Sequence, residues 1–228
     1  MIVSSRDKTC YLLELTDIAR GDVPNAFQMH LNSIKLIVDW AKEYVCQPHP
    51  QLGRPGSVCS FVPVSMKKGL FFLSVYPAEG LEENTAYDFL LKYRDFFLEL
   101  KPVIGDDAVF KTFLILFPYL PKEPSPKFID HLQQRLKLEF VKHGLMIGEF
   151  HFGLPQKTGL WKENFYPLYS PIPLLVIRYL VPNDFYSLSD QKEFVTLYLQ
   201  KCRDKIPEKL VNLVKEACIK FDINYPIL

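Results

Sequence analysis

The spacing of apolar residues divides the chain into predicted helices and strands. Apolar side chains recur every three or four positions over residues 33–46, which is typical of an amphipathic helix, and continuous apolar runs at 70–76 and 110–117 predict buried strands. A third short run leads up to His151, and a fourth spans 174–179. Helical patterns precede the second and third runs, and two more follow the fourth. The expected order is therefore α-β-α-β-α-β-loop-β-α-α.

This order predicts an α/β (or α+β) protein with a single mixed sheet of about four to six strands. Its core is expected to be a β-α-β-α-β unit over 70–150, flanked by an N-terminal helix and two C-terminal helices. Because crossover connections are right-handed, the core helices should cover mainly one face of the sheet. Residues 1–30 fit either a strand or a helical turn. No repeat, low-complexity tract or flexible linker interrupts the chain, so residues 1–228 are expected to form a single domain.

The bulk composition narrows the choice of partners. The 27 lysines and arginines nearly balance the 26 acidic residues, so the net charge of +1 gives no reason to expect nucleic acid or an anionic membrane as a partner. No apolar run approaches the ~18 residues of a membrane-spanning helix, and the N-terminus lacks a signal-peptide core. The five scattered cysteines favour a reducing cytosol. We expect a cytoplasmic protein that acts on a small-molecule substrate. The sequence is also compatible with a homodimer.

The stretch from 144 to 184 holds the first candidate site. His151 lies where the third predicted strand emerges into an irregular segment of about twenty residues, and such long segments are usually functional or disordered. The segment is rich in aromatic residues, which is not typical of disorder. We expect it to form a pocket wall with the imidazole of His151 at its root. The expected wall residues are Phe150, Trp161, Phe165 and Tyr166.

His151 and Cys59 each allow two interpretations. His151 can present a neutral imidazole to a metal or haem iron, or it can be hydrogen-bonded to the backbone at the end of a strand. Cys59 lies in the rigid segment 48–63, which contains two glycines and four prolines. It can act as an iron ligand or a nucleophile, or pack as a small hydrophobic residue. As a nucleophile it would use His49 or His151 as its base. A disulfide with Cys46 would require an oxidising setting.

Two arginines are candidates for binding an anion. Arg178 interrupts an apolar strand, where a charge has to be paired or to face a pocket. It can bind a substrate carboxylate or a haem propionate, or form a salt bridge at the edge of the strand. Arg54 offers the same planar fork from the 48–63 segment, or it is a solvated loop residue. Cys59 and Arg178 are the catalytic candidates, and His151 is the candidate metal ligand.

Three blocks of sequence carry a resemblance to known families. They are HPQLGRPGSVCSFV at 49–62, GEFHF at 148–152 and PLYSPIPLLVIR at 167–178. Together they resemble a bacterial domain family of unknown function over roughly residues 35 to 185. More distantly, the layout is similar to the YqcI/YcgG-type proteins, which include haem-dependent N-oxygenases. The chain differs from those proteins at Ser60 and Phe152, where they have proline.

The distant resemblance implies a haem cofactor with His151 as its ligand and Cys59 close to the pocket. The leading hypothesis is therefore a haem-binding protein that acts as an oxygenase on a small amino-acid-derived substrate. Arg54 and Arg178 would anchor propionates or the substrate carboxylate. Two alternatives stay open. One is a non-enzymatic interaction domain that uses its aromatic loop as a partner surface, and the other is an enzyme with Cys59 as its nucleophile.

Overall fold

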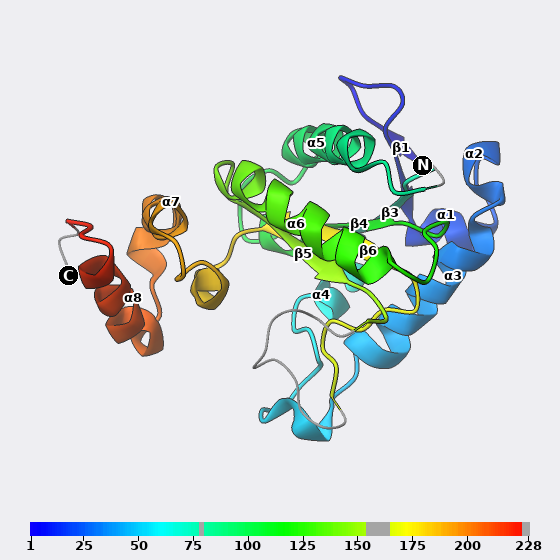
Figure 1. Ribbon diagram of the computed structural model, residues 1–228. Helices are drawn as coiled ribbons and strands as arrows, with labels where there is room; N and C mark the ends of the chain where they lie inside the picture. The colour runs from blue at the N-terminus through cyan, green and yellow to red at the C-terminus, as the bar shows by residue number, and fades with distance from the viewer. Residues whose placement is uncertain (78–79, 154–164, 225–228) are drawn as a thin grey trace.

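The computed structural model, which describes residues 1–77, 80–153 and 165–224, contains a mixed sheet flanked by helices (Figure 1). Among these residues, six strands run in the order β1-β2-β3-β4-β6-β5, which confirms the predicted fold class. The strands are β1 (Ile2–Val3), β2 (Tyr11–Glu14), β3 (Phe71–Val75), β4 (Thr112–Leu116), β5 (Leu145–Phe150) and β6 (Leu174–Tyr179). The α-helices are α1 (Leu15–Arg20), α2 (Asn25–Gln28), α3 (Leu31–Trp40), α4 (Val62–Lys67), α5 (Glu83–Glu99), α6 (Ser125–Val141), α7 (Lys192–Cys202) and α8 (Glu208–Lys220).

The predicted β-α-β-α-β core is present, but its third strand is not next to its second. β3 and β4 are parallel neighbours, with Phe72 opposite Phe113. β6 lies between β4 and β5 and is antiparallel to both, so that Ile177 is opposite Phe113 on one side and Ile147 on the other. This insertion makes β5 an edge strand, and the segment that carries His151 therefore leaves from the edge of the sheet.

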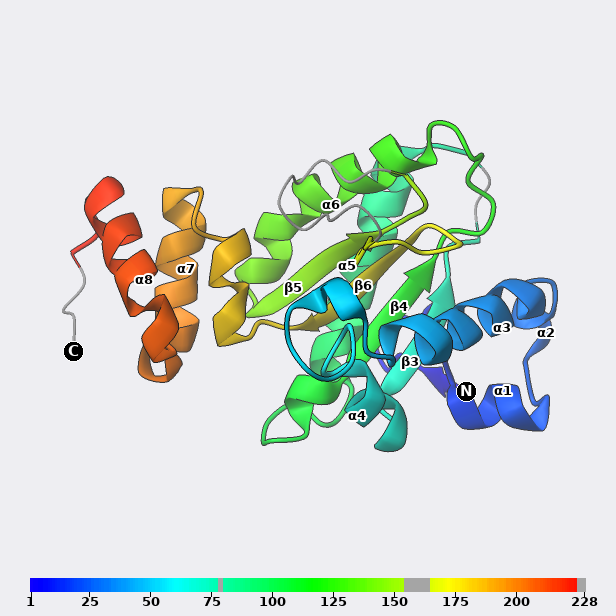
Figure 2. The same ribbon diagram turned by 90° about the horizontal axis from the view of Figure 1, so that it is seen from below.

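Helices α5 and α6 cover one face of the sheet, as predicted for two successive crossovers (Figure 1). Phe113 and Ile177 project from this face and pack with the helix residues Phe97 and Phe140 in one buried cluster. Alternate strand residues project to the opposite face, where the N-terminal helices and α4 lie (Figure 2). The two faces thus have separate cores, and the candidate site lies on the second face.

The N-terminal region, which the sequence left ambiguous, extends the sheet. β1 pairs with β2 and β2 pairs with β3, both antiparallel, with Leu13 opposite Leu73. The helix predicted over 33–46 is α3 followed by a π-helical turn, Ala41–Val45, in which the N–H of Cys46 donates to the carbonyl of Ala41. Such turns are frequent at functional sites. The 3₁₀ turns are Pro50–Leu52, Ala108–Phe110, Pro182–Ser187 and Arg203–Lys205.

Helix α6 covers the edge strand with buried polar residues at i, i+3 and i+7, namely Asp130, Gln133 and Lys137. Gln133 Nε2 donates to the carbonyl of Ile147 at 2.8 Å, which satisfies a backbone group of β5. Lys137 Nζ donates to the carbonyl of Ser187 at 2.6 Å. An uncovered edge strand can pair with other chains. These polar residues of α6 therefore help to prevent such pairing at β5, and they also position the end of this strand.

Lys111 is fully buried at the C-terminal end of α5. Its Nζ donates to the carbonyl oxygens of Phe97, at 2.7 Å, and of Leu100, and it lies 4.4 Å from the centre of the Phe97 ring. A helix C-terminus leaves such carbonyls without partners, so the ammonium group caps α5. Burial lowers the pKa of Lys111 from 10.5 to about 8.

Replacing Lys111 with methionine is expected to change the pH dependence of stability. Between pH about 8 and 10.5 the folded protein has released this proton while the unfolded chain still holds it. The unfolded state then binds more protons, so the contribution of this group to the free energy of unfolding rises with pH. Urea unfolding should show that the free energy of unfolding of the wild-type protein, relative to that of Lys111→Met, rises by on the order of 2 kcal/mol between about pH 7 and about pH 10.

The matched control for this experiment is Lys35→Met, which removes an exposed lysine. It reports the pH dependence that the rest of the chain contributes. A wild-type advantage over Lys111→Met that stays constant across the same pH range would contradict the lowered pKa.

Helices α7 and α8 form a third apolar cluster beside the sheet (Figure 1). Tyr198 and Leu210 are buried in it, and the hydroxyl of Tyr198 donates to the carbonyl of Pro182 at 2.9 Å. These are the two C-terminal helices that the sequence predicted. In the part of the chain that the structure describes, no helix has the length and apolar character needed to cross a membrane.

Candidate functional site

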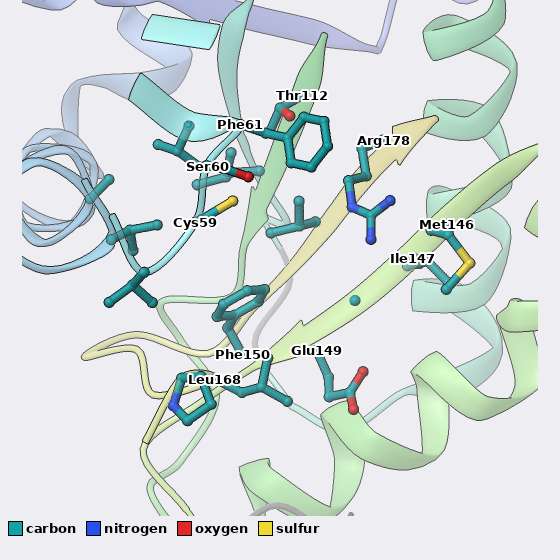
Figure 3. Close-up of a pocket in the computed structure, with 18 of the residues that line it drawn as sticks. Cys59, Ser60, Phe61, Thr112, Met146, Ile147, Glu149, Phe150, Leu168 and Arg178 are labelled. Carbon is teal, nitrogen blue, oxygen red and sulfur yellow. The ribbon is translucent and has the colours of Figure 1, made fainter. Parts of the chain in front are cut away.

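A cavity of about 410 Å³ lies on the second face of the sheet. β4, β6 and β5 form its floor, and the C-terminal end of α3, the π-helical turn and residues 54–62 form its wall (Figure 3). It reaches round the edge of β5 to α6 and the Pro182–Ser187 turn. This volume is in the range of small-molecule sites. Its apolar lining includes Trp40, Val45, Phe61, Phe71, Leu114, Met146, Phe150, Leu168 and Val176.

Strand register brings the floor residues together. Arg178 of β6 lies opposite Thr112 of β4 and Met146 of β5. Residues paired across neighbouring strands share a face, so all three line the cavity. Gly148, two positions along β5, has no side chain to fill the floor. A Cβ at this position would meet Phe150 Cε2 at 3.8 Å, which is an ordinary contact, so the glycine provides space rather than relieving a clash.

Arg178 is the charged group of the floor, and Asp184 holds it in place. Arg178 Nη2 donates to Asp184 Oδ1 at 2.6 Å, and Nη1 donates to Oδ2 at 2.7 Å. Nη1 also donates to the carbonyl of Tyr179 at 3.0 Å, and the N–H of Val181 donates to Asp184 Oδ2 at 2.8 Å. Burial alone would lower the pKa of Arg178, but the hydrogen bonds and charge of Asp184, with the charge of Cys59, raise it. The guanidinium group is therefore permanently charged and fixed in orientation.

These contacts leave one edge of the guanidinium group open. Of the five N–H donors of an arginine, Asp184 takes one from each terminal nitrogen and Tyr179 takes the second on Nη1. The Nε–H and the second Nη2–H have no partner among the described residues. They lie side by side on the planar group and match the two oxygens of a carboxylate. The side chain is 28% exposed, so a ligand can reach it.

Cys59 points into the cavity from the wall, and Arg178 points into it from the floor (Figure 3). Two backbone hydrogen bonds join the beginning and the end of the segment that carries Cys59. The N–H of Cys59 donates to the carbonyl of Val45 at 3.0 Å, and the N–H of Val58 donates to the carbonyl of Gln47 at 2.8 Å. The thiol of Cys59 is free, as are those of the other cysteines.

Arg54 and Phe150 also line the cavity. Arg54 is exposed, and its terminal nitrogens donate to two carbonyls of its own segment. Phe150 packs edge-on against Trp40, with the ring centres 5.9 Å apart. The structure thus brings four residues that the sequence singled out to one cavity, although they come from three separate parts of the chain.

The aromatic segment contributes less to the cavity than the sequence predicted. Phe165 is buried, but it stacks on His49, with the ring centres 4.5 Å apart, and neither residue lines the cavity. Tyr166 is 41% exposed and does not line the cavity either. Trp161 lies outside the described residues. No histidine is found among the described residues of the cavity lining, so neither His49 nor His151 is placed as a base for Cys59.

His151 is buried away from the cavity, and both of its ring nitrogens are bonded within the protein. Nδ1 accepts the N–H of Gly153 at 3.1 Å, and Nε2 lies 2.9 Å from Asp130 Oδ1. Because Nδ1 accepts, Nε2 carries the proton and donates to the carboxylate. Only glycine fits at position 153, since a Cβ there would lie 2.7 Å from the ring of Pro126. The imidazole therefore links the end of β5 to α6 through its hydrogen bond with Asp130.

This arrangement does not fit haem ligation by His151. A contact to Asp130 alone would be compatible with a metal on the other nitrogen, but Nδ1 already accepts the N–H of Gly153. In addition, the described residues contain no group of three or more His, Cys, Asp and Glu side chains that could hold a metal ion. The structure therefore corrects the expectation that this imidazole is presented, free of protein partners, to a hollow between strands.

Sequence reasoning missed the two carboxylates that fix these side chains, Asp184 and Asp130. A signal for Asp184 was available, because an arginine within an apolar strand needs an acid nearby and Asp184 follows Arg178 by six positions. The signal for Asp130 is its spacing from Gln133 and Lys137, which marks a polar stripe along a helix that is otherwise apolar on its buried side.

The fold and the cavity define a mixed α/β protein with a site of small-molecule size. The chain belongs to the family of the domain of unknown function DUF6875, whose sequence model matches residues 34–212. This match confirms that the chain is a member of a family without an assigned function, as the sequence blocks predicted. Comparison with curated proteins and with solved structures gives no match. The more distant resemblance to haem-dependent N-oxygenases stays a prediction.

Proposed function

We propose that this domain binds a small molecule that combines an apolar body with a carboxylate group. The observation that carries the proposal is the open Nε–H and Nη2–H edge of Arg178. A carboxylate that accepts both hydrogen bonds would gain a charge-assisted, bidentate contact at a group that Asp184 has already oriented. Since that orientation exists before binding, little entropy is lost at the anchor when a ligand binds.

The walls of the cavity support an apolar body for the ligand. Phe61 and Phe150 lie on either side of the space between Cys59 and Arg178 (Figure 3). Aromatic and aliphatic walls with a few placed polar groups are typical of small-molecule sites. Binding would remove apolar surface from water on the ligand and on the walls, and the arginine would determine the orientation.

An enzyme that uses Cys59 as its nucleophile is a second candidate function. The position of Cys59 in the cavity favours this candidate. A carboxylate held at Arg178 would place the rest of the ligand beside the Cys59 thiol, which points into the same cavity. The haem-dependent oxygenase stays a prediction that needs another iron ligand than His151. The absorption spectrum of protein treated with hemin tests it, because an unchanged hemin spectrum would end that hypothesis.

The affinity of the reduced protein for a carboxylate is expected to depend on Arg178. Phenylpropionate and octanoate should bind in calorimetric titrations, whereas phenylpropionamide and octanol, which lack the charge, should bind more weakly. Lysine keeps the positive charge beside Asp184 but loses the planar fork, so Arg178→Lys should weaken carboxylate binding by roughly 10- to 100-fold. Equal affinities for phenylpropionate and its amide, or a variant that binds like wild type, would contradict the proposal.

The matched control is Arg20→Lys, which makes the same exchange at an exposed position of α1 that does not line the cavity. Urea unfolding of both variants shows whether any loss of binding follows from a loss of structure. A loss that appears only in Arg178→Lys, at unchanged stability, identifies the guanidinium fork as the anchor.

A further inference from the structure

Cys46 and Cys59 come together at the base of the segment that walls the cavity. Pro48 and Ser57 form an antiparallel bridge, and the carbonyl of Gln47 accepts the N–H of Val58. Counting two positions from the Pro48–Ser57 bridge along each segment places Cys46 level with Cys59. The segment therefore brings two cysteines that are thirteen positions apart to facing positions.

The next hydrogen bond keeps the two cysteines facing each other. The N–H of Cys59 donates to the carbonyl of Val45, so Val45 and Cys46 together oppose Cys59. Val45 is the last residue of the π-helical turn, and Cys46 follows it with helical backbone angles, φ −83° and ψ −5°. The hydrogen bond from the N–H of Cys59 to the carbonyl that precedes Cys46 holds the two Cα atoms no more than about 7 Å apart, which reaches the range of roughly 4.4 to 6.8 Å that disulfides span.

The two thiols differ in their surroundings. The Cys46 thiol lies 3.9 Å from the sulfur of Met66, and burial, followed by the charge of Cys59, raises its pKa. Cys59 instead faces the cavity, and its charge contributes to the raised pKa of Arg178. A small oxidant that enters the cavity would therefore meet Cys59 first, with Cys46 as the neighbour that completes the reaction.

We propose that Cys46 and Cys59 form a reversible disulfide, with Cys59 as the thiol that reacts with a peroxide and Cys46 as the thiol that resolves the product. The Cys59 thiolate attacks one peroxide oxygen, the O–O bond breaks, and the departing hydroxide takes up a proton to leave as water. The Cys46 thiolate then attacks the sulfur of the sulfenic acid, the S–O bond breaks, and a second water leaves. Hydrogen peroxide is reduced by two electrons, and the two thiols are oxidised to one disulfide.

The disulfide would change the cavity as well as the chain. It would draw the Cys59 sulfur from the space opposite Arg178 towards Cys46, and it would lock the segment that supplies the wall. Its effect on ligand affinity rests on the proposed carboxylate site, but its formation does not. Peroxide can therefore act on this pair whether or not the cavity binds a carboxylate.

Peptide mass spectrometry tests the pairing directly. Trypsin does not cut between Arg54 and Pro55, so the peptide 43–67 contains both cysteines. After treatment with hydrogen peroxide and alkylation of free thiols, the wild-type peptide should be lighter by two hydrogens and carry no alkyl group, and a reductant should restore both sites. In Cys46→Ser the reaction should stop at a Cys59 sulfenic acid, which dimedone traps. In Cys59→Ser, Cys46 should stay a free thiol. The control Cys202→Ser, in the α7–α8 cluster, should still form the link.

Several results would overturn the proposal. They are alkylation of both cysteines after oxidation, a stable Cys59 sulfenic acid in the wild-type protein, or a disulfide between other cysteines. A sulfenic acid on Cys46 in Cys59→Ser would reverse the assigned roles and also contradict it. Because the mass measurement needs no ligand, these results are distinct from failure of phenylpropionate to bind the reduced protein.

Discussion

Replacing Asp184 with alanine is expected to lower the free energy of unfolding by about 3 kcal/mol, because it breaks a largely buried ion pair by removing one partner. Asp184 accepts two hydrogen bonds from Arg178 and one from the N–H of Val181, and its side chain is 9% exposed. The variant leaves a guanidinium group in the cavity floor without its carboxylate. Urea unfolding measures the loss, and calorimetry should show weaker phenylpropionate binding, since the anchor is no longer oriented.

The matched control for this variant is Asp107→Ala. Asp107 pairs with Lys68 at 2.8 Å, but both side chains are well exposed, 57% and 40% respectively. Exposed pairs of this kind contribute about 0 to 1 kcal/mol. Similar losses of stability in the two variants would show that the Arg178–Asp184 pair behaves as a surface pair, and would remove the argument that Arg178 is oriented before a ligand binds.

The strands and long helices could be predicted from the sequence because each has its own periodic pattern. β6 was predicted with the bounds that it has, and α6 was recognised from its apolar positions. The place of β6 between β4 and β5 could not be predicted in this way, because all three strands are apolar and the sequence pattern does not state which strands are neighbours. That insertion makes β5 the edge strand and places Arg178 beside Met146.

Four residues that the sequence singled out line the cavity, but the sequence did not predict the contacts that bring them there. Cys59 and Arg178 attracted attention because a cysteine between prolines and glycines, and an arginine within an apolar strand, are each unusual. Their meeting across one cavity depends on tertiary packing, which a single sequence does not encode as a local pattern. His151 attracted attention because it lies where a predicted strand emerges into a long irregular segment. Its partner Asp130 lies 21 positions earlier on a helix, and local reasoning did not connect the two residues.

Replacing His151 with alanine is expected to lower the free energy of unfolding by about 3 kcal/mol, because a buried carboxylate loses its partner and the ring leaves a cavity. Asp130 is 6% exposed and has the Nε2 of His151 as a hydrogen-bond partner at 2.9 Å. The same substitution tests the haem hypothesis. If the imidazole is structural, hemin should give the same absorption spectrum with the variant as with wild type, while the urea midpoint falls.

Two variants make this test specific. His131→Ala removes a histidine that is 61% exposed and paired with Glu83 at the surface, so it should cost no more than about 1 kcal/mol. The double variant His151→Ala/Asp130→Ala removes both partners, so its loss should be smaller than the sum of the two single losses, because no unpaired carboxylate remains. Additive losses would show that the two side chains do not depend on each other. A hemin absorption band that disappears in His151→Ala at unchanged stability would show instead that the ring serves an iron and that the fold does not need it.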